Sequence, residues 1–144
     1  MVEDSSSNWK PLESNPEVIN TFIQELGFDT TKYKLHDVMS TEDWAQEMVP
    51  PPVKAVFFLY PISQVQEDFR KTENDTITAS GQKVDDKLFY MKQYAGNACG
   101  TVAVFHAMIN LADTEEVLKS DSFIAKFIKE TKDRTPEDRG RYFE

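Results

Sequence analysis

The chain has a single cysteine, no long apolar run and comparatively few basic residues, and each shortage excludes a class of protein. One cysteine, Cys99, cannot close an internal disulfide, which excludes disulfide scaffolds and indicates a reducing compartment. No apolar run approaches the roughly 18 residues that span a membrane. Residues 1–7 have neither the basic nor the apolar region of a signal peptide. We therefore expect a cytoplasmic or nuclear protein without a membrane partner.

Acidic residues outnumber basic ones, 25 to 16, which gives a formal net charge of −9. Nucleic-acid phosphates would be repelled by such a surface, so a basic protein partner is favoured. No phosphate-binding glycine loop or zinc ligand set occurs, and no cofactor is expected. With 144 residues, 40% of them hydrophobic, the chain can form the core of one ordinary domain.

Two helices are expected in the first third of the chain. Asn15 followed by Pro16 is typical of a helix start and Gly27 of a helix end, and apolar residues recur on one face between them. A second, short helix is predicted after Ser40 and is ended by the prolines 50–52.

Three more helices are expected in the last third. Residues 98–111 are apolar on nearly all sides, which predicts a helix buried at the centre of the domain. Apolar residues recur at helical spacing over 123–128, and Thr135 is a typical cap for a final helix.

Between these helices the sequence predicts strands. Residues 33–38 alternate like a strand, and residues 53–60 are apolar on both faces, as in a central strand. Residues 88–91 lead into the turn at Gln93. Residues 67–83 are polar without sustained periodicity and are predicted to be a surface loop. The expected fold class is α/β (α+β), with helices around a central sheet.

The segment 93–101, Gln-Tyr-Ala-Gly-Asn-Ala-Cys-Gly-Thr, places Cys99 at the start of the apolar helix. Unpaired N–H groups and the positive end of the helix dipole favour a thiolate there. Asn97 is predicted to cap the helix, and Gly96 permits a tight approach. Gly100 is predicted to leave room for a substrate backbone. The pattern indicates a thiol nucleophile.

Gln93, six residues before Cys99, supplies a second element of such a site. The carbonyl oxygen becomes negative during acyl transfer, and the N–H of Cys99 and the amide of Gln93 can both donate hydrogen bonds to it. Papain-like cysteine proteases place an oxyanion-hole glutamine at the same spacing. A structural thiol is the alternative, because free cysteines are often buried.

The segment around Cys99 resembles the active site of the ubiquitin C-terminal hydrolases, a papain-like family of cysteine deubiquitinases. Residues 9–17, 48–56 and 90–93 resemble the same family in order and spacing. The resemblance implies a papain-like fold and a catalytic domain of which residues 9–144 are the N-terminal part, after a disordered tail over residues 1–8.

The same resemblance assigns roles to individual residues. Cys99 would be the nucleophile and Gln93 the oxyanion donor for cleavage after the C-terminal glycine of ubiquitin. Acidic residues of the family hold the arginines of the ubiquitin tail, and the matching positions here are Glu13, Glu17 and Asp37. Leu12 is assigned to the same ubiquitin-binding set. Each carboxylate is otherwise a solvated or capping group, and one in the first turn of a helix is favoured anyway.

The catalytic His and Asp of the family have no counterpart in this sequence. His106 lies seven residues beyond Cys99 on one helix, roughly 10 Å away at ~1.5 Å per residue, and is assigned to packing or solvent. His36 is also predicted to be structural. We therefore expect either a fragment or a truncated gene product of a longer enzyme that is monomeric at full length. By itself this chain is expected to have little activity and an exposed apolar surface, and to be poorly soluble or molten.

Three functions remain open from the sequence. The first is thiol-dependent hydrolysis at the C-terminus of ubiquitin or of a ubiquitin-like modifier. The second is catalytically inactive binding of ubiquitin, and the third is an unrelated acidic domain with a buried Cys99. Capture of a ubiquitin that carries a C-terminal electrophile separates them.

Overall fold

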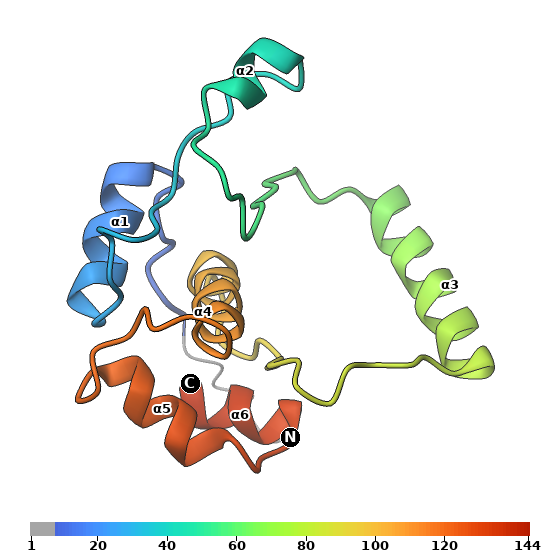
Figure 1. Cartoon of the computed structure of the whole chain (residues 1–144). Coiled ribbons are helices and arrows are strands. Elements are labelled where there is room, and N and C mark those ends of the chain that lie inside the picture. Colours follow the sequence, from blue (N-terminus) through green and yellow to red (C-terminus); the bar gives the residue numbers. More distant parts are fainter. Residues whose placement is uncertain (1–7) are drawn as a thin grey trace. The chain divides into compact units, whose positions relative to one another are not determined.

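The computed structural model describes residues 8–144, which form helices joined by irregular segments (Figure 1). The helices are α1 Pro16–Glu25, α2 Asp43–Glu47, α3 Gln64–Ser80, α4 Cys99–Ala112, α5 Phe123–Thr131 and α6 Pro136–Phe143. They belong to two compact units. The first contains the described residues up to Ala55 together with Phe89–Glu144, and the second is Val56–Leu88.

The helix α4 is the centre of the first unit, as its apolar composition predicts. Its buried apolar side chains are Val102, Val104, Phe105, Met108 and Ile109. The ring of Phe105 meets Phe127 of α5 and Phe143 of α6 edge-on, with centroids 5.7 Å and 4.6 Å apart. Figure 1 shows α5 and α6 packed beside one end of α4.

The helix α1 begins and ends where the sequence predicts. The side chain of Asn15 accepts a hydrogen bond from the N–H of Glu17 at 2.9 Å, and a proline occupies the first turn. Gly27 follows the helix with a φ of 97° and lies against Ser122, where a β-carbon would not fit. The apolar face of the helix reaches the core through Ile23, which is 1% exposed.

The last two helices also confirm their signals. Ser122 caps α5 by accepting a hydrogen bond from the N–H of Ala125 at 3.1 Å, and Thr135 caps α6 by accepting one from Asp138 at 3.2 Å. The short helix α2 ends before the prolines 50–52, as expected.

The prediction of a loop over 67–83 is wrong, because α3 covers most of that range. Ser63 and Gln66 form a capping box: the serine hydroxyl accepts from the N–H of Gln66, and the glutamine side chain accepts from the N–H of Ser63 at 2.9 Å. No residue of α3 is buried. The sequence of α3 is mostly polar and has no continuous apolar stripe of the kind that marks a packed helix, and its large apolar side chains Val65, Phe69 and Ile77 are exposed.

Among residues 8–144 no strand forms, and the predicted strands over 33–38 and 53–60 are absent. Two isolated bridges occur instead, Asn8 with Gly96 and Phe28 with Leu118. A strand needs a neighbour to satisfy its backbone groups, and here side chains of helices bind part of those groups. Of the predicted tail, residues 1–7 lie outside the described residues.

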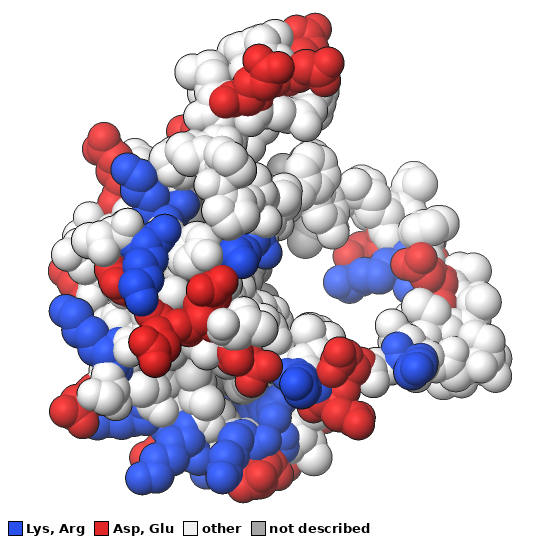
Figure 2. All heavy atoms as spheres, in the orientation of Figure 1, with Lys and Arg blue, Asp and Glu red and all other residues white. Residues whose placement is uncertain are grey.

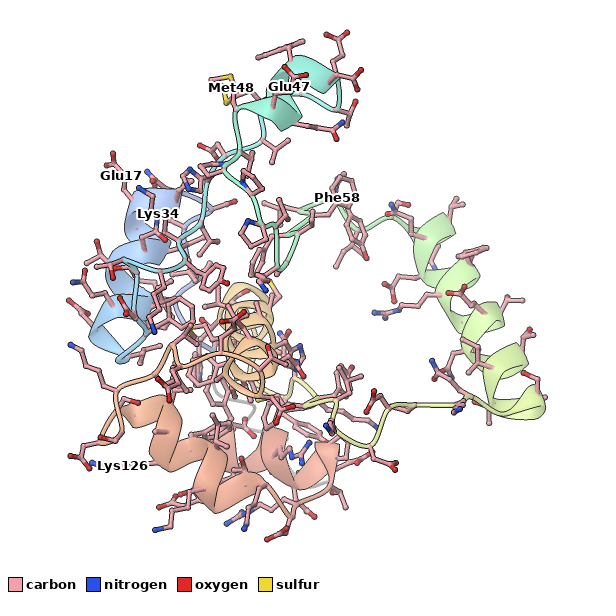
Figure 3. The ribbon with its side chains drawn as sticks, viewed as in Figure 1. Glu17, Lys34, Glu47, Met48, Phe58 and Lys126 are labelled. Atoms are coloured by element: carbon pink, nitrogen blue, oxygen red, sulfur yellow. The ribbon has the colours of Figure 1, made fainter. Side chains whose placement is uncertain are left out.

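Residues 53–60 carry exposed apolar side chains. Val56, Phe58 and Leu59 are 80%, 82% and 75% exposed, and Figure 3 shows the labelled Phe58 on an irregular segment. The apolar surface expected from the sequence is therefore present, whereas poor solubility stays a prediction. No helix within residues 8–144 combines the length and apolarity needed to cross a membrane.

Candidate active site

Cys99 is the first residue of α4, and its thiol is free and exposed. The prediction that Asn97 caps this helix is wrong: Ala98 occupies the cap position, and no side chain makes a capping hydrogen bond. Asn97 has a φ of 60° instead, in the left-handed region that asparagine tolerates better than most residues. It turns the chain sharply into the helix, which leaves the helix start without a side-chain cap beside the thiol.

Gly100, which follows Cys99, makes room for the chain itself. A β-carbon on Gly100 would lie 3.2 Å from the β-carbon of Leu12, so that side of the glycine faces the N-terminal segment. The space predicted for a substrate backbone on this side of Gly100 is therefore filled by Leu12. Leu12, which is partly buried against the core, links the segment 9–13 to the start of α4.

Gln93 lies in the turn that precedes α4 and is exposed. Its side-chain nitrogen donates a hydrogen bond to the carbonyl oxygen of Ala95 at 3.0 Å. An amide nitrogen carries two N–H groups, so this bond uses one of them and orients the other. Ala95 itself is 4% exposed, and the glutamine is thus attached to a buried part of the loop.

The segment before Gln93 is bound by side chains of α4. Asn110 accepts a hydrogen bond from the N–H of Phe89 at 2.8 Å and donates to its carbonyl oxygen at 3.0 Å. His106 accepts a hydrogen bond at Nε2 from the N–H of Met91 at 3.1 Å. Burial lowers the pKa of His106. The structural role predicted for this histidine is confirmed.

The same segment is bound by α6. Arg139 donates to the carbonyl oxygen of Tyr90 at 3.1 Å, and the N–H of Lys92 donates to the carbonyl oxygen of Pro136 at 2.9 Å. Lys92 also pairs with Glu137 at 2.5 Å, and this hydrogen bond raises the pKa of the lysine and lowers that of the glutamate.

The N-terminal segment contacts the loop on the other side of Gln93. The N–H of Trp9 donates to the carbonyl oxygen of Gly96 at 2.9 Å. The α-carbon of Gly96 is so close to the side chain of Asn8 that no β-carbon fits between them without a shift. The ring of Trp9 packs on Phe143, with centroids 5.1 Å apart. Gly96 therefore permits a close approach, as predicted, and the partner is the N-terminal segment.

Two of the predicted acidic residues, Glu17 and Asp37, line one groove of about 520 Å³ between α1 and residues 34–37. Lys34 and His36 line it as well, and Figure 3 shows the labelled Glu17 and Lys34 beside α1. Asn20 of α1 fixes residues 34–37, which form the other wall of the groove. Its side chain accepts a hydrogen bond from the N–H of Leu35 at 2.8 Å and donates one to the carbonyl oxygen of Leu35 at 3.0 Å.

The remaining predicted residues connect this groove to Cys99. Glu13 lies next to Leu12 in the chain and accepts a hydrogen bond at 3.4 Å from Asn15, which lines the groove. Figure 2 shows acidic side chains gathered over α2, whereas acidic and basic side chains are interleaved over the lower part of this unit.

Within residues 8–144 neither histidine is hydrogen-bonded to Cys99. His106 is occupied by Met91, and His36 is exposed on the groove wall. No group of three potential ligands among these residues could hold a metal ion. Sequence reasoning missed the roles of Asn110 and Arg139. The signal that could have been used is the polar Asn110 four residues after His106, on the same side of a largely apolar helix, because both side chains bind the backbone of residues 89–91.

Comparison with known proteins places this geometry in context. Residues 9–144 match the family described as ubiquitin carboxyl-terminal hydrolase, family 1. The chain is 43% identical over 142 residues to ubiquitin carboxyl-terminal hydrolase 3 of Arabidopsis thaliana, with 97% of this chain and 58% of the relative covered.

Two further relatives are similar over most of this chain. A ubiquitin carboxyl-terminal hydrolase of Drosophila melanogaster is 40% identical, with 94% of this chain and 58% of the relative covered. A probable ubiquitin carboxyl-terminal hydrolase of Dictyostelium discoideum is 39% identical, with 94% and 52% covered. The chain thus spans little more than half the length of these relatives.

Proposed function

The chain belongs to ubiquitin carboxyl-terminal hydrolase family 1, and from this premise we propose that the protein hydrolyses bonds to the C-terminal glycine of ubiquitin. Cys99 is the nucleophile. The observation that supports this assignment is the exposed thiol at the uncapped start of α4, in a turn that also carries Gln93. A thiol read as a structural core residue would lie in the interior.

In the proposed reaction the thiolate of Cys99 attacks the carbonyl carbon of the terminal glycine. The carbonyl electrons move to the oxygen, and the N–H of Cys99 and the second amide N–H of Gln93 stabilise that oxyanion. The leaving group departs with a proton, and water then hydrolyses the thioester to release ubiquitin and the thiol.

Neither histidine of the described chain serves as the base in this proposal. Nε2 of His106 accepts the N–H of Met91, and its place on α4 is seven residues from Cys99, roughly 10 Å along the axis at ~1.5 Å per residue. We assign the proton transfers to a histidine oriented by an aspartate, in the part of the family's domain that this chain does not span.

The ubiquitin tail is proposed to lie along Leu12 and Glu13 toward the groove. Leu12 contacts the backbone beside Cys99, and Glu13 bonds to a residue of the groove wall. An extended tail with its glycine at the thiol would then bring its arginines to Glu17 and Asp37. Charge-assisted bonds between arginine and carboxylate are the strong class of polar contact.

Three coarser features accompany this proposal. The complete domain is proposed to be a monomer with a papain-like central sheet, in which residues 53–60 gain the strand neighbours they lack here. A reduced thiol suits the cytoplasm or nucleus. The net charge of −9 suits a basic protein partner rather than nucleic acid.

The test is capture of ubiquitin that carries a C-terminal electrophile, scored as a covalent adduct by mass spectrometry. We expect an adduct at Cys99 that Cys99→Ser abolishes. In the complete catalytic domain, which supplies the base, we expect turnover of a ubiquitin C-terminal amide that Gln93→Ala lowers by about 10²–10³. Binding of ubiquitin without an adduct would support an inactive ubiquitin-binding protein instead. Adduct formation that persists in Cys99→Ser would overturn the assignment of the nucleophile.

A further inference from the structure

We propose that His106 and Asn110 are positioning residues that fix the oxyanion donor Gln93 relative to Cys99. This inference rests on the proposed function. Its basis is a juxtaposition along one helix: α4 carries the nucleophile at its first residue and, seven and eleven residues later, binds the backbone of the segment that leads to Gln93.

The contacts of this segment alternate between two elements. The backbone groups of Phe89 and Met91 bond to α4, whereas those of Tyr90 and Lys92 bond to α6. Successive residues of an extended chain direct their backbone groups to opposite sides. The segment is therefore held on both sides like a strand between two neighbours, and Gln93 follows directly.

Only one of these two sides includes the nucleophile. A helix of this length behaves as a rigid unit. The bonds to His106 and Asn110 therefore fix the backbone of Phe89 and Met91 relative to Cys99, which lies on the same helix. The bonds to α6 fix the same segment to the core without reference to the thiol. The separation between thiol and oxyanion donor is thus set by α4.

Both side chains are fixed themselves. The nitrogen of Asn110 donates to the carbonyl oxygen of His106 at 2.7 Å, which orients its amide. The ring of His106 stacks on Tyr90, with centroids 5.0 Å apart, and meets Phe89 edge-on at 6.4 Å. Because Nε2 accepts a hydrogen bond, the neutral ring carries its proton on Nδ1.

The experiment uses the full natural protein and two probes. Iodoacetamide alkylates the thiolate of Cys99 without forming an oxyanion. Ubiquitin with a C-terminal aldehyde forms a hemithioacetal: the sulfur bonds to the aldehyde carbon, the carbonyl electrons move to the oxygen, and the thiol proton ends on that oxygen. Only the second probe reports the oxyanion site.

We expect His106→Phe and Asn110→Leu to bind the aldehyde about 10- to 100-fold more weakly. A misplaced Gln93 amide still stabilises the oxyanion in part, so the loss should be smaller than when the amide is removed. Their alkylation rates should stay within about twofold of the parent, since the thiol is untouched. His106→Gln keeps an acceptor near the position of Nε2 and should restore most of the affinity. Should His106→Phe not fold, Asn110→Asp, which keeps the oxygen that accepts from the N–H of Phe89, is compared with Asn110→Leu, which removes it.

Two further variants distinguish positioning from stability. In a Gln93→Ala background the same substitutions should cost no further affinity, because an absent donor cannot be misplaced. Val117→Ala removes part of a side chain that is 1% exposed and lies outside the segment and its anchors, so it should lower stability and leave aldehyde affinity unchanged.

The outcomes separate the two levels of the proposal. Absence of an aldehyde adduct in the parent protein, or equal affinity in Cys99→Ser, overturns the proposed function and this inference with it. A normal adduct in the parent combined with unchanged affinity in His106→Phe and Asn110→Leu overturns the positioning role alone. Losses that add to that of Gln93→Ala also overturn it.

Discussion

Gly140 of α6 lies directly against the carbonyl group of Lys92, so closely that a β-carbon would overlap the carbonyl oxygen and carbon. The carbonyl belongs to the backbone just before Gln93 and cannot rotate away as a side-chain end can. The glycine therefore permits the close packing of α6 against the segment that carries the proposed oxyanion donor.

Gly140→Ala is expected to destabilise the protein by about 1–3 kcal/mol through overpacking. Helix propensity alone predicts that Gly140→Ala stabilises the protein, because alanine is favoured over glycine in a helix by about 1 kcal/mol. Urea unfolding measures the difference.

Gly96→Ala is the matched control for this substitution. Its β-carbon would meet the end of the Asn8 side chain, which can turn away. The loss should therefore be smaller than for Gly140→Ala. A stabilised Gly140→Ala protein would show that α6 does not pack on Lys92 in this way.

Stability is expected to fall as the pH drops below the ordinary pKa of histidine, near 6.5. Burial lowers the pKa of His106 in the folded state, so between the two pKa values the unfolded chain binds the proton and the folded chain does not. This contribution is complete above about pH 6.5 and is lost as the pH falls toward the folded value. Thermal unfolding at a series of pH values measures it.

His106→Gln should remove this part of the pH dependence, since no titrating group then accepts the N–H of Met91. The exposed His36 supplies the control, and His36→Gln should retain the dependence. Equal slopes in the parent and His106→Gln between pH 5 and 6.5 would contradict the assignment to this histidine.

Most helices followed from local signals, whereas the pairing of segments did not. The cap at Asn15, the cap at Thr135 and the apolar composition of α4 each act within a few residues, and the structure has those helices. The absent strands over 33–38 and 53–60 show the opposite case, because a strand depends on a neighbour elsewhere in the chain.

The candidate site divides in the same way. The place of Cys99 at the start of a helix and of Gln93 in the preceding turn could be predicted from spacing. The bond from Met91 to His106 and the contact of Leu12 with Gly100 join distant parts of the chain, so no local pattern contains them. The sequence predicts Asn97 as the N-cap of α4, whereas in the structure its left-handed conformation forms the turn before the helix.

The exposed helix α3 is expected to depend on its capping box. Ser63→Ala removes the acceptor for the N–H of Gln66 and should cost about 0.5–2 kcal/mol in the first turn. Because no residue of α3 is buried, tertiary packing cannot compensate. Hydrogen exchange of the amides over 64–68 measures the loss.

Thr72→Ala is a suitable control for this effect. Its hydroxyl bonds within the helix to the carbonyl oxygen of Asp68 at 2.9 Å, and that carbonyl already belongs to the helical ladder. Exchange over 64–68 should be unchanged in this variant. Equal protection in Ser63→Ala and the parent would show that the box contributes nothing to α3.

The groove between α1 and residues 34–37 is expected to bind ubiquitin through its carboxylates. Glu17→Gln and Asp37→Asn remove one charge each at nearly constant shape and should weaken binding about two- to fivefold each, the range of exposed ion pairs. The loss should shrink at high salt, because screening weakens the same pairs in the parent. Calorimetry with Cys99→Ser as the parent measures affinity without turnover.

Lys34→Gln is the control that fixes the sign of this prediction. Lys34 lines the same groove, so its removal changes the surface as much as the loss of a carboxylate, but it removes a charge that repels arginine. Binding should stay equal or become tighter. Weaker binding in Lys34→Gln, to the same extent as in Asp37→Asn, would mean that the groove is sensitive to any change and does not select a basic tail by charge.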